Sequence, residues 1–182
     1  MKANQLDILI IPGYKGSGPD HWQTRWEQKL STARRVQQIQ WSKPAREEWV
    51  NAVEAAIEQA NKPIAIIAHS LGVPTAIHAV ARNPEKIRGA FFVAPPDIEN
   101  EKIHSKHLMT FAPYHRKSLP FPSVVVASHN DEFCHFSVAQ KLAHDWGALF
   151  VDAGQSGHIN VESGHGPWPE GLILLSHFFS KL

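Results

Sequence analysis

The fold is decided by the stretch Pro63-Ile64-Ala65-Ile66-Ile67-Ala68-His69-Ser70-Leu71-Gly72. An apolar run rich in isoleucine ends at a His-Ser pair, and a segment of small residues with helical character follows. This order predicts a strand, a sharp turn and a helix, with Ser70 at the apex of the turn. The pattern is that of a nucleophile elbow, G-x-S-x-G, with Ala68 in place of the first glycine.

The turn of a nucleophile elbow is expected to have two roles. It holds the Ser70 hydroxyl clear of the sheet, and it aims the backbone N–H of Leu71 at the place where an oxyanion would form. The alternative is that Ser70 only caps the helix of a Rossmann-like fold. Residues further along the chain favour the elbow, because an acid and a Gly-His pair follow in the order Ser, Asp, His.

Composition bounds the class of protein. The 182 residues are expected to form a single domain, 1–182. With 18 basic and 17 acidic residues the chain shows no basic stripe, which argues against nucleic acid as a partner. Its apolar runs are too short to cross a membrane. The single cysteine, Cys134, excludes an internal disulfide framework and favours a reducing, cytoplasmic location.

Apolar runs alternate with helical patterns along the whole chain. Such alternation predicts a three-layer α/β sandwich around a six-stranded, mainly parallel sheet. The strands are expected at 7–12, 36–41, the run ending at His69, 87–94, 122–128 and 148–152. The helices are expected from a cap at Asp20 to about 33, and at about 46–60, 72–82, 136–146 and 169–181.

A glycine-rich loop, residues 13–19, follows the first strand. It lacks the Gly-Lys-Ser/Thr ending of a phosphate loop, and no G-x-G-x-x-G is present, which argues against nucleotide binding. Beside an elbow, such a loop supplies the second N–H of an oxyanion hole. Tyr14 is the expected donor, and an ordinary strand-to-helix turn is the alternative.

Twelve histidines and six tryptophans are many for this length, and they either fill core and surface or line a cleft. His21 and Trp22, beside the glycine-rich loop, are expected to wall a substrate pocket. The irregular segment 98–121 carries several aromatic residues and two prolines. It is expected to form a short cap or substrate loop over the carboxyl edge of the sheet, rather than a surface excursion.

Three side chains are expected to converge at that edge. A serine hydroxyl becomes a nucleophile when a histidine takes its proton, and a carboxylate holds the histidine in the required tautomer. Ser70, Asp131 and His158 each follow the carboxyl end of an expected strand. Parallel strands all present this end at the same edge, so their distances in sequence do not matter.

Alternatives exist for the acid and the base. Asp97 could be the acid, whereas Asp152 is nearer the strand body and is expected to be structural. His165 competes with His158 as the base, but it and Trp168 suit a pocket wall better. His69 is expected to pack under the elbow. No H-E-x-x-H is present and the single cysteine has no partner at finger spacing, so neither a metal nor a cofactor is expected.

Together these segments resemble the small α/β-hydrolases of the retinoblastoma-binding-protein / YdeN type. The segments that carry the resemblance are 12–22, 69–72, 130–131, 157–160 and 164–169. The resemblance implies a minimal α/β-hydrolase fold without a large lid domain. It also implies a serine–aspartate–histidine triad on Ser70, Asp131 and His158, and esterase activity on short acyl esters.

Three hypotheses follow for the function. The first is a serine hydrolase that cleaves small carboxylic esters through an acyl-enzyme. The second is a non-catalytic homologue that grips a protein or a metabolite, because a fold does not fix a function. The third is an acyltransferase or thioesterase that uses the same three residues.

Overall fold

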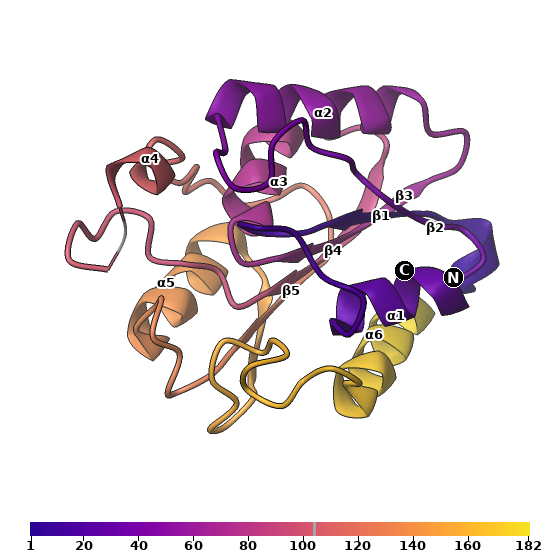
Figure 1. Ribbon diagram of the computed structural model, residues 1–182. Coiled ribbons are helices and arrows are strands. Elements are labelled where there is room, and N and C mark those ends of the chain that lie inside the picture. Colours follow the sequence, from indigo (N-terminus) through magenta and orange to yellow (C-terminus); the bar gives the residue numbers. More distant parts are fainter. Residues whose placement is uncertain (104) are drawn as a thin grey trace.

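A computed structural model describes residues 1–103 and 105–182, and its centre is one parallel sheet (Figure 1). The six strands lie in the order β2-β1-β3-β4-β5-β6 and each pairs in parallel with its neighbours. Every strand therefore ends at the same edge of the sheet. The strands are β1 (Asp7–Ile11), β2 (Ala33–Arg35), β3 (Ile64–His69), β4 (Ile87–Val93), β5 (Ser123–Ala127) and β6 (Leu149–Asp152).

The central strands are apolar throughout because both faces of the sheet are covered. All six residues of β3 are buried, as are the last four of β1. Their side chains alternate between two cores, so Ile66 faces one layer of helices and Ile67 faces the other. The expected three-layer α/β sandwich with a six-stranded sheet is confirmed.

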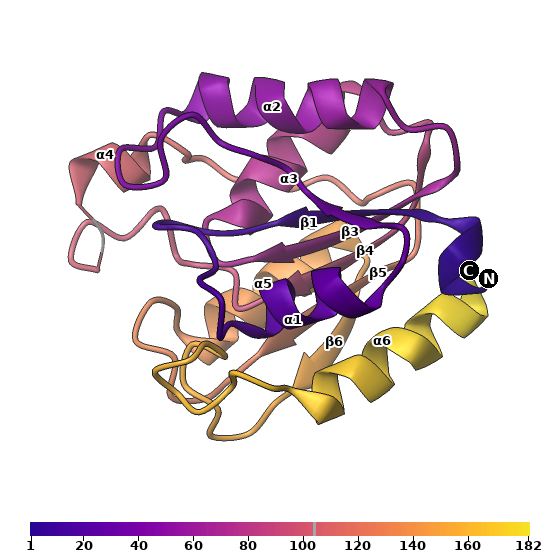
Figure 2. The ribbon, with the colours of Figure 1, turned by 45° about the vertical axis from the view of Figure 1, so that its right-hand side comes forward.

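The helices form a layer on each face of the sheet. Figure 2 shows α2 and α3 on one side of the sheet and α1 and α6 on the other. Trp49 of α2 and Trp146 of α5 share the first core, whereas Trp26 of α1 and Phe178 of α6 belong to the second. The helices are α1 (Trp22–Lys29), α2 (Arg46–Glu58), α3 (Gly72–Arg82), α4 (Lys106–Met109), α5 (Phe136–Trp146) and α6 (Pro169–Lys181), with a 3₁₀ turn at Ala3–Gln5.

Three expected boundaries, two of α1 and one of the edge strand, were wrong. The cap of α1 is His21 rather than Asp20, because the His21 ring accepts the N–H of Gln23. This helix also ends at Lys29 instead of residue 33, because Leu30 is already extended. The first edge strand lies at Ala33–Arg35 rather than 36–41, since pairing with β1 stops at Arg35.

The irregular segment 98–121 holds the short helix α4, and its residue 104 lies outside the described residues. Two of its aromatic side chains, Phe111 and Tyr114, are buried in the first core, and the Tyr114 hydroxyl donates to the carbonyl of Pro96 at 2.9 Å. The segment is therefore anchored to the sheet layer, and the residues that the structure describes form no large lid over the strands.

A third, small cluster joins β5 to α5. It contains Ala127, Cys134 and Ala139. Burial, reinforced by the nearby Asp131 and Asp97 carboxylates, raises the pKa of the Cys134 thiol to about 12. The thiol therefore stays protonated at neutral pH. None of the helices in the described parts of the chain is both long and apolar enough to span a bilayer.

Candidate active site

Ser70 stands at the turn between β3 and α3. Its φ of 53° lies in the left-handed region, and its N–H donates to the carbonyl of Val93 on β4. Gly72 allows the start of α3 to lie directly against β1. A Cβ at this position would be 2.2 Å from the carbonyl oxygen of Ile11. This strained turn between a buried strand and a helix has the geometry of the predicted elbow.

Ser70, His158 and Asp131 lie in hydrogen-bonding succession. His158 Nε2 is 2.8 Å from Ser70 Oγ, and His158 Nδ1 is 2.9 Å from one carboxylate oxygen of Asp131. A carboxylate can only accept, so Nδ1 carries the proton and Nε2 is free to accept from the serine hydroxyl. The His158 and Asp131 side chains are only 8% and 3% exposed, so the hydrogen bonds between these residues are shielded from water.

Phe133 contacts both His158 and Asp131, and the sequence analysis did not predict this role. Its N–H donates to Asp131 Oδ1 at 2.9 Å, and its ring meets the His158 ring at 4.6 Å between centroids. Asp131 thus receives a second hydrogen bond while the imidazole packs against an apolar wall. The spacing Asp-x-Phe, an aspartate accepting from the N–H two residues on, is the signal that could have indicated it.

The alternative acids and base lie elsewhere. The Asp152 carboxylate accepts from His129 Nε2 at 2.9 Å and from the Gly154 N–H at 2.7 Å. Asp97 makes no hydrogen bond to His158 among the described residues; its own N–H donates to the carbonyl of Phe133. His165 Nδ1 contacts Ser163 Oγ at 3.2 Å. Among the residues that the structure describes, the hydrogen bonds thus connect Ser70 to His158, and His158 to Asp131, rather than to the alternative acids or base.

Two backbone N–H groups near the elbow, those of Leu71 and Tyr14, bear on the expected oxyanion hole. A Cβ on Gly13 would lie 2.7 Å from Ser70 Cβ and 3.0 Å from the Leu71 nitrogen, so the glycine-rich loop passes directly against the elbow. The N–H groups of Leu71 and Tyr14 have no acceptor among the described residues. An oxyanion hole would need two such N–H groups without a protein acceptor.

The structure buries three of the four residues that were predicted to wall a substrate pocket. Trp22 is completely buried and Trp168 is 6% exposed; their rings pack on Trp26 in the second core. His21 is 6% exposed and caps α1. Tryptophan supplies large apolar area to a core, and the sequence did not reveal which side of the loop these rings face. His165 is half-buried at the surface.

His21 and His69 form a buried layer behind His158. The His69 ring lies 4.9 Å from each of the other two rings, and its Nε2 is 2.9 Å from the His158 carbonyl oxygen. Burial, reinforced by the Arg35 guanidinium and the neighbouring His158, lowers the pKa of His21 to about 4. Burial also lowers the pKa of His69 well below its ordinary value. Both rings are neutral at pH 7.

Hydrogen bonds from the side chains of Asn130 and Gln23 connect the loops and strand that form the site. Asn130 Oδ1 accepts from the Gly157 N–H and from Ser128 Oγ, each at 2.7 Å. On the other side, the fully buried Gln23 accepts from Ser17 Oγ at 2.7 Å and donates to the Ile67 carbonyl at 3.2 Å. These contacts bind the acid loop to the base loop, and the glycine-rich loop to β3.

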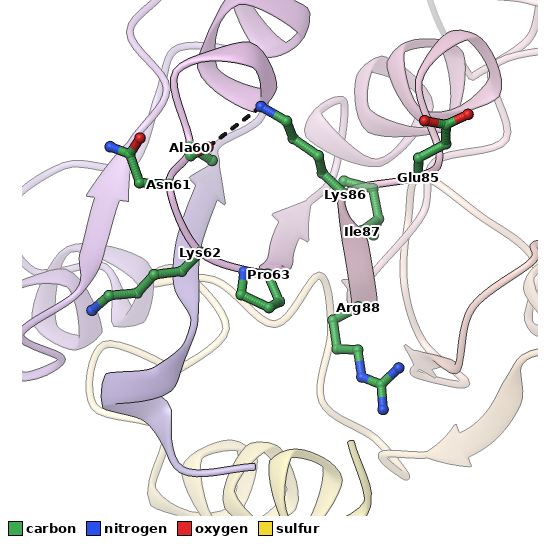
Figure 3. Close-up of a pocket in the computed structure, with 8 residues that line it drawn as sticks. All are labelled: Ala60, Asn61, Lys62, Pro63, Glu85, Lys86, Ile87 and Arg88. Carbon is green, nitrogen blue, oxygen red and sulfur yellow. Dashed lines mark hydrogen bonds between the residues drawn. The ribbon is translucent and has the colours of Figure 1, made fainter.

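A hollow of about 450 Å³ lies at the opposite edge of the sheet, before β3 and β4. Figure 3 shows Lys86 reaching back to the carbonyl of Ala60, while Lys62 and Arg88 extend in different directions. Lys62 donates to the Asn4 carbonyl and Arg88 to the Leu182 carbonyl. Because these three cationic side chains are bonded to backbone carbonyls, they do not converge on a ligand position in the hollow. In the described part of the chain no cluster of side chains is arranged to bind a metal.

Comparison with known proteins places the chain in a family. The sequence model of the serine hydrolase family matches residues 8–177. The chain belongs to the serine hydrolase family. A search of curated proteins found no match for this serine hydrolase.

Solved structures agree with the family. A YdeN-like hydrolase from Pectobacterium atrosepticum is 34% identical, with a TM-score of 0.86 over 97% of this chain and 91% of its own. The ydeN gene product of B. subtilis is 20% identical, with a TM-score of 0.78 over 96% of this chain and 99% of its own. Carboxylesterase CesB of Bacillus subtilis is 13% identical, with a TM-score of 0.62 over 93% and 81%. The last two matches show the α/β-hydrolase fold, and the first supports a YdeN-type serine hydrolase.

Proposed function

We propose that this serine hydrolase cleaves small carboxylic esters, with Ser70 as nucleophile, His158 as general base and acid, and Asp131 orienting His158. The observation that carries the proposal is the unbroken succession from Ser70 Oγ through both ring nitrogens of His158 to the Asp131 carboxylate. The YdeN-type relationship and the two unpaired N–H groups beside the serine give further support.

The reaction would proceed in two steps. Ser70 Oγ attacks the ester carbonyl while His158 Nε2 takes the hydroxyl proton, and Asp131 stabilises the imidazolium that results. The N–H groups of Leu71 and Tyr14 hold the oxyanion. When the carbon–oxygen bond of the alcohol breaks, His158 returns the proton to the departing oxygen. A water molecule, deprotonated by His158, then attacks the acyl-enzyme and releases the acid and free Ser70.

Esters of small acids suit the site for two reasons. A carboxylic ester offers one carbonyl oxygen for the N–H pair and a leaving oxygen that needs one proton. In the described part of the segment 98–121 the one helix is the short α4, so no large lid built from these residues encloses a long acyl chain. We further propose a cytoplasmic protein that acts without a cofactor, metal, nucleic acid or membrane partner.

The test combines turnover with covalent labelling. The purified protein is given p-nitrophenyl acetate, butyrate and octanoate, and separately a fluorophosphonate probe with peptide mapping. We expect hydrolysis of the short esters and labelling at Ser70. Loss of a member of such a triad costs several orders of magnitude in rate, so Ser70→Ala should abolish both signals. Ser137→Ala, at an exposed position of α5, is the matched control.

Two results would redirect the assignment. Absence of both labelling and hydrolysis in the folded protein would favour a non-catalytic binder. Products that carry an added alcohol or thiol acceptor, in preference to free acid, would favour an acyltransferase. Ester hydrolysis that survives Ser70→Ala would contradict the proposed nucleophile.

A further inference from the structure

The turn that carries His158 is held in an unfavourable backbone conformation. Gly157 has a φ of 54° and Ile159 a φ of 49°. Glycine adopts the left-handed region freely, but a β-branched residue such as isoleucine does so only at a cost in free energy. The Ile159 side chain is completely buried, so contacts outside the turn must over-determine its shape.

Three side chains from three different parts of the chain supply these contacts, one to each residue of the turn. Asn130 Oδ1, after β5, accepts the Gly157 N–H at 2.7 Å. His69, at the end of β3, lies 2.9 Å through its Nε2 from the carbonyl oxygen of His158. Trp22 Nε1, in α1, donates to the carbonyl oxygen of Ile159 at 2.8 Å. Together the three hydrogen bonds fix the position and orientation of the His158 backbone, and with it the imidazole ring.

His69 is the most informative of the three. Because its partner is a carbonyl oxygen, Nε2 must carry the hydrogen and donate it. The ring is 5% exposed and packs between the His21 and His158 rings, which leaves it little freedom to turn. His69 also precedes Ser70 directly, so the end of one buried strand sets the position of nucleophile and base together.

We propose that His69 is a positioning residue, whose Nε2–H bond to the His158 carbonyl holds the base within reach of Ser70. This inference rests on the proposed hydrolase function. Its hydrogen bond goes to the His158 carbonyl oxygen and not to a ring nitrogen of that residue, so it acts through the backbone of His158. A shift of about 1 Å in such a group can lower turnover on the order of 10²-fold.

Two substitutions separate the hydrogen bond from packing. His69→Leu fills similar space but cannot donate, whereas the amide nitrogen of His69→Gln can donate from nearly the position of Nε2. We expect His69→Leu to lower kcat for a short ester on the order of 10²-fold with KM nearly unchanged, and His69→Gln to recover most of kcat. Trp22→Phe, which removes the Nε1 donor, should lower kcat in the same way.

Assays run well below the melting temperature of each variant, with the folded fraction checked by circular dichroism. Equal kcat in His69→Leu and the parent protein would overturn the proposal. So would equal losses in His69→Leu and His69→Gln, because packing alone would then explain the effect. A parent protein no faster than Ser70→Ala would contradict the hydrolase function itself, and this inference would fall with it. That pattern differs from the other two, in which the parent is active.

Discussion

At the residue scale, Gly13 sets how closely the first loop can approach the nucleophile. We predict that Gly13→Ala lowers kcat/KM on the order of 10²-fold, because its Cβ would lie 2.7 Å from Ser70 Cβ and displace the loop that carries Tyr14. Gly18→Ala is the control, since a Cβ there meets nothing within 4 Å. Steady-state ester kinetics of both variants measure the effect; similar values would refute this role of Gly13.

The three central residues could be predicted from the sequence because each follows a strand of a parallel sheet. Such a sheet brings Ser70, Asp131 and His158 to one edge without any knowledge of loop shape. Asn130 and Phe133 could not be found in this way. Their contacts with Gly157 and His158 run from loop to loop and depend on turn geometry, which apolar periodicity does not encode.

At the scale of elements, the close contact of α3 with β1 depends on Gly72 having no side chain. A Cβ on Gly72 would lie 2.2 Å from the Ile11 carbonyl oxygen, and both backbones are buried and rigid. We predict that Gly72→Ala lowers the free energy of unfolding by about 1–3 kcal/mol or more, as overpacking does. Urea unfolding measures this change.

Ala68→Gly provides the contrast at the other end of the elbow. Ala68 is completely buried in β3, and glycine is the residue of the common motif there. We predict only a modest loss of stability, roughly 0.5–1 kcal/mol from backbone entropy plus the lost methyl contact, with ester hydrolysis retained. If Ala68→Gly destabilised the protein more than Gly72→Ala, the argument from close approach would fail.

The apolar patterns located the buried elements better than the exposed ones. The boundaries of α6 and the Gly147 stop of α5 agree with the structure, because proline and a left-handed glycine mark them. The edge strand β2 is only three half-buried residues long, so its sequence carries no clear alternation. Trp41 suggested a longer strand, but it packs on Gly16 instead.

At the scale of the whole molecule, the two buried imidazoles should make stability depend on pH. The folded protein holds the pKa of His21 at about 4 against an ordinary 6.5, so the unfolded chain takes up the proton first as the pH falls. Stability is therefore lost between these two values, and His69 acts in the same direction. Each pH unit in that window costs about 1.4 kcal/mol for His21.

His21→Asn tests this dependence, because asparagine keeps a side-chain acceptor for the N-terminus of α1 but does not titrate. We predict that the free energy of unfolding lost between about pH 7 and pH 5 is smaller in His21→Asn than in the parent, by about 2 kcal/mol. Urea unfolding at both pH values measures it. An identical loss in both proteins would exclude His21 as the source.

The position of Cys134 has a practical consequence. With its sulfur enclosed between β5 and α5 and its pKa near 12, the native protein should resist maleimides and iodoacetamide. A second cysteine introduced at an exposed position would then be the sole attachment point for a fluorophore or spin label. Motions of α4 relative to the sheet could be followed in this way without first removing the natural thiol.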